Sequence, residues 1–408
     1  MIHDLRHALR TFLRMPAFTV TAVLTLALGI GANVAIFGIV DGVLLRPLPL
    51  ADPDRLVVIW ETHPTLPVPF MVASPPHIMD WRAERALFDE VGGFSTTRLI
   101  LADGGSAEQI VGASVWGGLL PALGIAPAAG RFFEPGEYQS GAPRVVILSD
   151  GLWRRRFGAD RSIVGKPIVL SGSEYTVVGT MPERFNFLPS ITIQGKPPLE
   201  RSQFWIPQRI DDPSQMRGAH FLTTVARLRI GVSIGTAEAR LHANAMRLWR
   251  EYPADEEGWD VRLLPLMTQA TAGIRPTLLL LFGAVVFVLL LTCTNVASLL
   301  LARATGRRKE MAVRAALGAS RVRIARQLLT ESAVLCSIGA CAGLLVGAWG
   351  VRFARAFGPA SIVRLDEARV DVRIVIFTIA VAGVAALLCG GPALRATRVE
   401  PTVALRAH

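Results

Sequence analysis

The sequence predicts an α-helical membrane protein with four transmembrane helices and a large α+β extracytoplasmic domain inserted between helices 1 and 2. Two observations support this prediction. Hydrophobic residues make up 51% of the 408 residues, which is a high share for a soluble domain. Four runs without a charged residue approach or exceed the ~20 residues that a helix needs to cross hydrocarbon, and a long polar stretch separates the first run from the second.

Residues 1–14 have the pattern of an amphipathic helix that lies on a membrane surface. Four apolar side chains share one helical face and three arginines lie on another: Leu5, Leu9, Phe12 and Leu13, and Arg6, Arg10 and Arg14. This pattern predicts contact with anionic membrane lipids on the cytosolic side. Residues 15–46 are predicted to form helix 1. The uncharged run 15–40 is longer than the about 7–15 apolar residues of a signal peptide, so we expect this helix to remain uncleaved.

Residues 47–275 are predicted to form the extracytoplasmic domain. The segment RPLPLADP has three prolines in eight residues and cannot continue a helix. Six later segments have the alternation of strands: LVVIW, RLIL, RVVIL, YTVVG, FLTTVARL and WDVRLLPL. Three segments look helical, namely PHIMDWRAERALFDEV, LSDGLWRRRFGAD and TAEARLHANAMRLWREY, the last capped near Ser233 or Thr236. Residues 47–275 are long enough for one large or two small α+β domains; in the second case the break lies near residues 182–198 and the chain returns to the first lobe afterwards.

The second uncharged run determines the orientation. Residues 276–302, predicted as helix 2, precede a cytosolic elbow at residues 303–331 that holds eight Lys or Arg against two Glu. The positive-inside rule places this elbow in the cytoplasm. Both termini are then cytosolic. The remaining segments are helix 3 at residues 332–351, an outer loop at 352–373, helix 4 at 374–394 and a cytosolic tail at 395–408.

The net charge of +11 is a signal of topology rather than of nucleic-acid binding. Residues 47–275 hold 23 basic and 24 acidic side chains, so the excess of basic residues lies mainly in the predicted cytosolic segments. We therefore expect no nucleic-acid partner. The four cysteines all lie in apolar runs, which leaves the polar domain without a disulfide framework.

The sequence has no pattern typical of a catalytic, cofactor or metal site. The nearest match to a phosphate loop, ADRSIVGKP, has Asp160 where the first glycine is needed and Pro167 in place of Ser or Thr after Lys166. His3 and His7 are four residues apart, but they lie in the cytosolic amphipathic segment, and no HExxH pattern occurs. We therefore expect no enzymatic activity in this chain.

Glycines spaced four residues apart mark packing faces in two of the predicted membrane helices. Small residues at this spacing let two helix backbones approach closely in lipid. Packing within the chain and dimerisation explain the pattern equally well. The residues are Gly38 and Gly42 in helix 1 and Gly339, Gly343 and Gly347 in helix 3.

The cytosolic elbow is the best candidate for a functional site. Residues 307–317 can form a short helix that Gly318 ends, and Ser320 can cap the helix that follows. A short rigid helix between two turns can transmit a push from a soluble partner into two membrane helices. The alternative is a basic loop that only sets the topology and contacts anionic lipid. The candidate docking residues are Arg307, Arg308, Lys309, Glu310, Met311, Arg314, Leu317, Gly318 and Ser320.

Three stretches of the chain resemble the MacB/FtsX-type permeases of ABC systems. They are TLALGIGANVAIFGIVDGVLLRPLP, VVILSDGLWRRRFGADRSIVGKPIVLSGSEYTVVGTMPERF and TNVASLLLARATGRRKEMAVRAALGASRVRIARQLLTES. The tail VEPTVALR is also similar to the usual ending of this family. The likeness runs over nearly the whole chain, which resembles one half of the double-length orphan permeases of the family.

The resemblance implies a coupling helix, matched here by residues 307–320, that docks on a separate cytosolic ABC ATPase. It also implies a second permease copy or paralogue and a place in the bacterial cytoplasmic membrane. ATP is then the ligand of the partner, and this chain needs no cofactor. Its function would be export or mechanotransmission, in which ATP-driven closing moves the outer domains. The alternative is a non-transporting transmembrane regulator of an extracytoplasmic enzyme or sensor partner.

Overall fold

The computed structural model describes residues 12–13, 15–102, 106–183, 185, 202–306, 321–358, 365 and 368–396. The chain divides into two compact units. We call Met1–Arg46 with Ile274–His408 the membrane unit, and Pro47–Gly273 the sheet unit. The sheet unit is therefore an insertion between the first and second long helices, as the sequence predicts.

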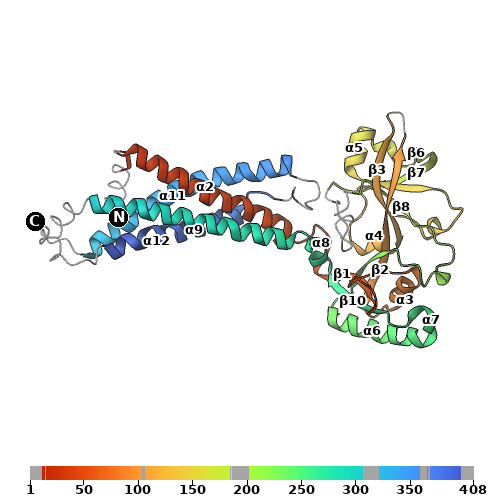
Figure 1. Ribbon diagram of the computed structural model, residues 1–408. Helices are drawn as coiled ribbons and strands as arrows, with labels where there is room; N and C mark the ends of the chain where they lie inside the picture. The colour runs from red at the N-terminus through yellow and green to blue at the C-terminus, as the bar shows by residue number, and fades with distance from the viewer. Residues whose placement is uncertain are drawn as a thin grey trace, which may run out of the picture. The chain divides into compact units, whose positions relative to one another are not determined.

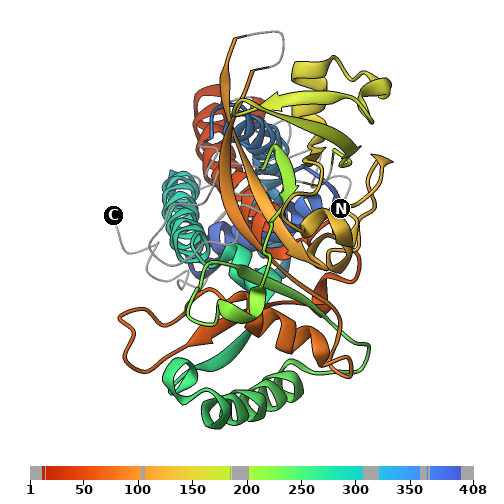
Figure 2. The ribbon, with the colours of Figure 1, turned by 90° about the vertical axis from the view of Figure 1, so that its right-hand side faces the viewer.

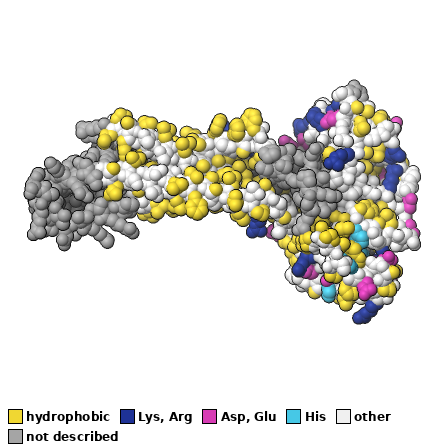
Figure 3. Space-filling model, viewed as in Figure 1, with side chains coloured by type: hydrophobic (Ala, Val, Ile, Leu, Met, Phe, Trp, Pro, Cys, Tyr) yellow, Lys and Arg dark blue, Asp and Glu magenta, His cyan; other side chains and the backbone are white. Residues whose placement is uncertain are grey.

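Long apolar helices form the membrane unit (Figure 1). Their apolar stretches are long enough to cross a membrane, and they cover Pro16–Leu45, Arg275–Ala302, Leu329–Phe357 and Val372–Cys389. Hydrophobic side chains cover the visible face of these helices (Figure 3), as expected for a surface that faces lipid. The helices themselves are α2 (Pro16–Val40), α9 (Arg275–Gly306), α11 (Arg321–Phe357) and α12 (Val372–Ala396).

Helix α11 begins at Arg321, as the sequence predicts for a helix that follows Ser320 and runs on into helix 3. It continues to Phe357, so residues 352–357 of the predicted outer loop are helical. Charged residues near both ends delimit the uncharged run but do not break the helix, because Arg and Glu are good helix formers. Helix α2 begins with a proline at its first position, where the missing N–H costs no hydrogen bond. It ends in a π-helical turn, η1 (Asp41–Leu45).

A ten-stranded mixed sheet forms the sheet unit (Figure 2). The strand order is β10-β1-β9-β2-β3-β8-β5-β7-β4, and β6 pairs with β2 and β7. Most neighbouring strands are antiparallel, whereas β3 with β8 and β5 with β7 are parallel. The strands are β1 (Leu56–Thr62), β2 (Phe88–Leu101), β3 (Glu108–Gly117), β4 (Ala129–Gly130), β5 (Val145–Leu148), β6 (Pro167–Leu170), β7 (Ser173–Thr180), β8 (Phe204–Pro207), β9 (Thr223–Leu228) and β10 (Asp260–Pro265).

Helices cover parts of this sheet and close its hydrophobic clusters. Helix α6 is amphipathic, and its buried residues Ala237, Leu241 and Leu248 face the sheet. The helices are α3 (Pro75–Ala83), α4 (Leu119–Ala122), α5 (Asp150–Phe157), α6 (Ile234–Glu251), α7 (Pro253–Glu256) and α8 (Leu266–Thr271). Single 3-10 turns are η2 (Pro53–Arg55), η3 (Pro135–Tyr138), η4 (Arg161–Ile163) and η6 (Pro213–Gln215).

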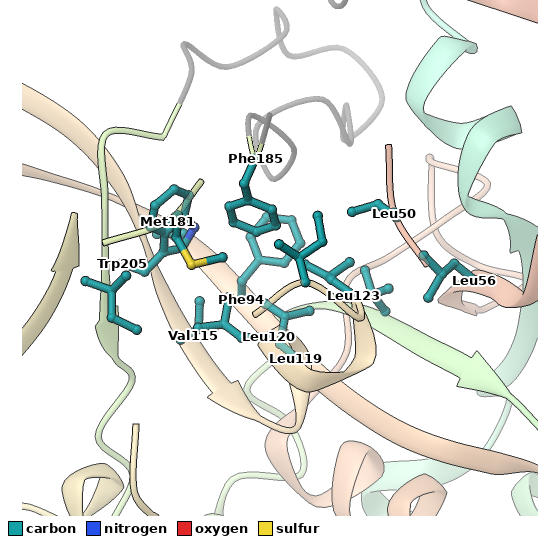
Figure 4. Close-up of a cluster of buried hydrophobic side chains, with 14 of the residues drawn as sticks. Leu50, Leu56, Phe94, Val115, Leu119, Leu120, Leu123, Met181, Phe185 and Trp205 are labelled. Carbon is teal, nitrogen blue, oxygen red and sulfur yellow. The ribbon is translucent and has the colours of Figure 1, made fainter. Parts of the chain in front are cut away.

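The largest buried cluster joins residues that are distant in the sequence (Figure 4). Phe94 of β2, Leu119 of α4 and Trp205 of β8 all lie in it, together with Phe185. Trp205 and Phe185 are almost completely buried, and their ring centroids are 5.1 Å apart. The segments before and after residues 182–198 therefore share one hydrophobic core and one sheet, although the sequence suggested a possible domain boundary there. Residues 184, 186–198 lie outside the described residues.

All six predicted strand segments are strands in the structure, and one predicted helix is too long. The helix expected over PHIMDWRAERALFDEV ends at Ala83, and β2 begins at Phe88. Phe88 and Val91 are buried in the sheet, where pairing with β9 overrides the local helical pattern. The predicted cap of the last helix is Ser233, whose hydroxyl accepts a hydrogen bond from the Thr236 N–H.

Candidate functional site

The candidate docking residues of the coupling elbow lie outside the described residues. Residues 307–320 contain all of them, from Arg307 to Ser320. The two helices that flank this segment are described: α9 leads into it at Gly306, and α11 leaves it at Arg321. By sequence, residues 307–320 therefore connect two helices of the membrane unit.

Three glycines on α11 let it approach α2 closely. A methyl group built on Gly339 would lie 2.7 Å from Leu26 Cβ, and one on Gly343 would lie 3.0 Å from Ile30 Cβ. At Gly347 the nearest atom would be Val34 Cγ1, at 2.4 Å. Gly31 of α2 makes the reciprocal contact, since a methyl group there would lie 3.0 Å from the Gly343 carbonyl oxygen. The two helices therefore pack along a face of small residues within one chain.

The glycines on helix 1 are also buried within the chain. A methyl group on Gly38 would lie 3.1 Å from both Val351 and Ile374. Gly38 thus lies against both α11 and α12. Gly42 is buried in the π-helical turn η1 that ends this helix. Gly38 on helix 1 and the three glycines of α11 therefore lie in contacts among the helices of the membrane unit.

Asn33 of α2 is a buried polar residue that joins two helices. Its side-chain nitrogen donates to the Gly29 carbonyl at 2.9 Å and to the Val285 carbonyl of α9 at 2.8 Å. Only 1% of Asn33 is exposed. Because a polar group inside a membrane bundle needs a partner, this amide fixes the rotation of α2 against α9.

A charged cluster lies where α2 ends and α12 begins. Asp41 is 1% exposed, and its carboxylate contacts Arg46 Nε at 2.9 Å and Arg373 Nη1 at 3.4 Å. Arg46 also contacts Asp371 at 2.7 Å. The π-helical turn brings this about, because the Arg46 N–H bonds the Asp41 carbonyl five residues back. Asp41 is the one acidic residue within the four membrane helices predicted from the sequence, and its carboxylate forms ion pairs with two arginines.

A second buried cluster of charged residues lies in the sheet unit, and sequence reasoning missed it. Glu61 is the residue before the last of β1, His77 lies on α3, His220 precedes β9 and Glu256 ends α7. The carboxylate of Glu61 contacts Nδ1 of His77 through one oxygen and Nδ1 of His220 through the other. Nε2 of His77 lies 2.7 Å from the Glu256 carboxylate. We call these four residues the His–Glu cluster.

The carboxylates of the His–Glu cluster determine the protonation of His77. Burial alone would lower the pKa of His77, but Glu61 and Glu256 outweigh burial and raise this pKa to about 10. Burial would likewise raise the pKa of both carboxyls. The imidazoles, and at Glu256 also Arg217, instead hold those pKa values below the ordinary range. His77 is therefore an imidazolium held between two carboxylates when no other ligand is bound.

Two family models match this chain. The MacB-like periplasmic core domain matches residues 19–244, which is more than half of the chain. The FtsX-like permease C-terminal model matches residues 282–401. The chain belongs to the MacB/FtsX-type permeases of ABC systems. Together with the four candidate spans, this places the permease in the inner membrane as a multi-pass protein.

The permease is similar to several curated transport proteins. It is 26% identical over 283 residues to the pyoverdine export ATP-binding/permease protein PvdT of Pseudomonas syringae pv. tomato, which covers 68% of this chain and 40% of the relative. It is 24% identical over 210 residues to the macrolide export ATP-binding/permease protein MacB of Chromobacterium violaceum, covering 52% and 30% respectively. The match to each of these relatives therefore spans less than half of the relative's length.

Solved structures of outer domains are also similar to the permease. The extracellular domain of the transporter YknZ from Gram-positive bacteria matches with a TM-score of 0.36 and 14% identity, covering 51% of this chain and 99% of that domain. The periplasmic region of MacB from Actinobacillus actinomycetemcomitans matches with a TM-score of 0.37 and 12% identity, covering 55% and 92%.

Proposed function

We propose that this permease is the membrane subunit of an ABC-type export or mechanotransmission complex. A separate cytosolic ATPase binds and hydrolyses ATP, and the coupling elbow at residues 307–320 docks on it. Closing of the ATPase moves the elbow, and the helices on either side carry that movement to the sheet unit, which lies outside the cytoplasmic membrane. Both termini of the chain are then cytosolic. The permease itself needs no cofactor and no catalytic residue.

The observation that best supports this mechanism is the continuity of α11. This helix runs without a break for 37 residues from Arg321, which directly follows the coupling segment 307–320, to Phe357. At a rise of 1.5 Å per residue its length is about 55 Å, which exceeds the ~30 Å thickness of the hydrocarbon core. A helix of this length can carry a displacement from one side of the membrane to the other.

The packing of α2 supports transmission to the sheet unit. Helix α2 leads by sequence directly into the sheet unit, and α11 packs closely against it along the glycine face. Asn33 adds a hydrogen bond from α2 to α9, which leads into the elbow. A push on the elbow would therefore reach α2 through two helices, because close packed and hydrogen-bonded contacts resist sliding.

The proposed complex also contains a second copy or paralogue of this permease. Export relatives are named for pyoverdine and macrolides, so these are the first substrates to test.

The second candidate function is a regulator that transports no substrate and switches an extracytoplasmic enzyme or sensor on or off. Such a regulator would bind an extracytoplasmic protein stably, and no substrate would stimulate ATP turnover.

The elbow substitution tests this function in a reconstituted complex. The permease is purified with its co-purifying ATPase, and Arg307, Arg308, Lys309 and Glu310 are replaced together by alanine. We expect substrate-stimulated ATP turnover to fall at least about tenfold, since a coupling loss of 1.4 kcal/mol already corresponds to a factor of ten. ATP turnover of the ATPase alone serves as the baseline.

A matched control replaces exposed arginines of the sheet unit. Arg154, Arg240 and Arg247 are 59–65% exposed and make surface ion pairs, which contribute little stability. Replacing these three by alanine should leave ATP turnover unchanged. Unchanged turnover in the elbow variant, with the complex still assembled, would remove the elbow from the mechanism.

A further inference from the structure

The His–Glu cluster has the composition and arrangement of a metal site. Two imidazole Nδ1 atoms, from His77 and His220, face the two oxygens of the same Glu61 carboxylate. One ligand atom from each of the three residues lies within 4.8 Å of the others. The three side chains are 1–8% exposed. Nothing in the transmission of movement requires two histidines and a carboxylate to converge here.

We propose that Glu61, His77 and His220 bind one divalent transition-metal ion of the zinc class. Two imidazoles and one carboxylate form a common ligand set for zinc, with a fourth position open to water. Tetrahedral zinc–ligand bonds of about 2.0–2.2 Å place the ligand atoms roughly 3.4 Å apart. Glu61 is in hydrogen-bond contact with both imidazoles, so small side-chain rotations must separate it from them as the ion enters. This inference does not depend on the proposed transport function.

The surroundings of His77 match those of a metal-bound histidine. A ligating histidine usually donates its other ring N–H to a carboxylate, which fixes the orientation of the ring. Nε2 of His77 lies 2.7 Å from Glu256, while Nδ1 faces Glu61. Glu256 is held in turn by Arg217 at 3.1 Å, and Arg217 also contacts Asp80 at 3.2 Å. The outer partners are therefore in place on the side of the ring away from the ion.

His220 is oriented by an aromatic ring instead. Its imidazole stacks on the indole of Trp259, with 4.2 Å between ring centroids and 19° between planes. A small cavity beside the cluster is lined by Glu61, His77 and Glu256 as well as by Trp259. The site is thus closed by protein on several sides and adjoins a space that a metal-bound water can use.

Metal binding replaces a proton in this arrangement. The ion takes the position between Glu61 and the Nδ1 atoms of His220 and His77. His220 binds as the tautomer that carries its proton on Nε2, and the Nδ1 proton of His77 leaves to solvent as the metal–nitrogen bond forms. The Nε2 proton of His77 stays on the ring and points to Glu256. The ligands come from β1, α3 and the segment before β9, so the bound ion would link three parts of the chain that are distant in sequence.

Cobalt binding to the full-length chain tests this proposal. The chain is purified in detergent without a polyhistidine tag, treated with a chelator, and titrated with Co²⁺ while its visible absorption is recorded. We expect one Co²⁺ per chain with the intense bands of a four-coordinate site, and displacement by Zn²⁺. His220→Gln and Glu61→Gln should weaken Co²⁺ binding by more than tenfold. Glu256→Gln should weaken it about 10–100-fold, because the outer partner orients the ligand.

Two control variants remove other histidines. His242 on α6 pairs with Asp260 at 2.8 Å but has no third ligand nearby among the described residues, so His242→Gln should bind Co²⁺ as the unchanged chain does. His3→Gln tests the amino-terminal pair of histidines in the same way. Zn²⁺ should also raise the Tm of the unchanged chain but not that of the His220→Gln variant.

The unchanged chain alone can overturn the proposal, whether or not the variants fold. Absence of saturable Co²⁺ binding after chelator treatment would mean that the His–Glu cluster is only an ion-paired network. Binding that His3→Gln or His242→Gln abolishes would place the ion elsewhere. Co²⁺ binding of unchanged affinity by folded His220→Gln and Glu61→Gln chains would equally contradict the assignment of these residues as metal ligands.

Discussion

Replacing Gly347 by alanine is expected to destabilise the membrane unit by about 1–3 kcal/mol, the cost of overpacking a close contact. The new methyl group would lie 2.4 Å from Val34 Cγ1 and 3.0 Å from the Gly31 carbonyl oxygen. The carbonyl belongs to the backbone of α2 and cannot rotate away, so α11 must move outward. Since this contact lies on the proposed route from elbow to sheet unit, coupling of ATP turnover to substrate should fall as well.

Buried thiols provide the measurement for this variant. Cys293, Cys336 and Cys389 are at most 2% exposed, whereas Cys341 is exposed. In a Cys341→Ser background, the temperature at which a thiol-reactive dye labels the chain reports opening of the membrane unit. Gly347→Ala should lower that temperature.

A glycine of α12 gives the matched control. Gly383 also lies in a membrane helix, but a methyl group built on it has no atom within 4 Å among the described residues. The dye should therefore label the Gly383→Ala chain at the same temperature as the unchanged chain, or at a slightly higher one, because alanine is a better helix former than glycine. Equal labelling temperatures for the two variants would refute close packing of α11 against α2.

Replacing Gly112 by alanine should destabilise the sheet unit by about 3 kcal/mol, at the upper end of the overpacking range. Gly112 lies on β3 beside the parallel strand β8, and a methyl group there would lie 2.4 Å from the Phe204 carbonyl oxygen and 2.7 Å from its ring. Both neighbours are fixed, one by backbone pairing and one by complete burial. For a unit of this size, the Tm should fall by about 6–12 °C.

Tryptophan fluorescence follows this change in the full chain. Trp349 is the one tryptophan in the membrane unit, and the other seven of the eight lie in the sheet unit. Gly136→Ala is the control, because Gly136 has open space around it and no positive φ. If the Gly112→Ala chain has the same Tm as the Gly136→Ala chain, β8 does not pack on β3 as described.

The four membrane spans could be predicted because hydrocarbon excludes charge so strongly that the uncharged runs mark them. The outer end of α11 was harder to predict, since Arg352 and Arg355 lie beyond the uncharged run yet remain helical. The position of α11 against α2 could not be decided from the sequence. The spacing of Gly339, Gly343 and Gly347 predicts a packing face but does not identify the helix that packs against it.

In the sheet unit, segments rich in β-branched residues were predictable, whereas β3, β4, β6 and β8 were not. Strand β3 is the longest of the four. Its sequence EQIVGASVWG contains small residues that pack because β2 and β8 lie on either side. The His–Glu cluster was missed for a related reason. Its ligands come from segments up to 159 residues apart, so no short spacing reveals them. The one available signal was Glu61, a charged residue that follows directly on the apolar run LVVIW.

Distance measurement between two copies of the permease tests the central claim most directly. Ile230 lies in the sheet unit and is 86% exposed, so Ile230→Cys in the Cys341→Ser background takes a spin label there. The labelled permease is reconstituted in lipid nanodiscs with its ATPase, and the distance between the two labels is measured by pulsed electron paramagnetic resonance. A non-hydrolysable ATP analogue should shift the distance distribution, and the elbow variant should abolish the shift. An unchanged distribution in a complex that still hydrolyses ATP would contradict transmission of movement to the sheet unit.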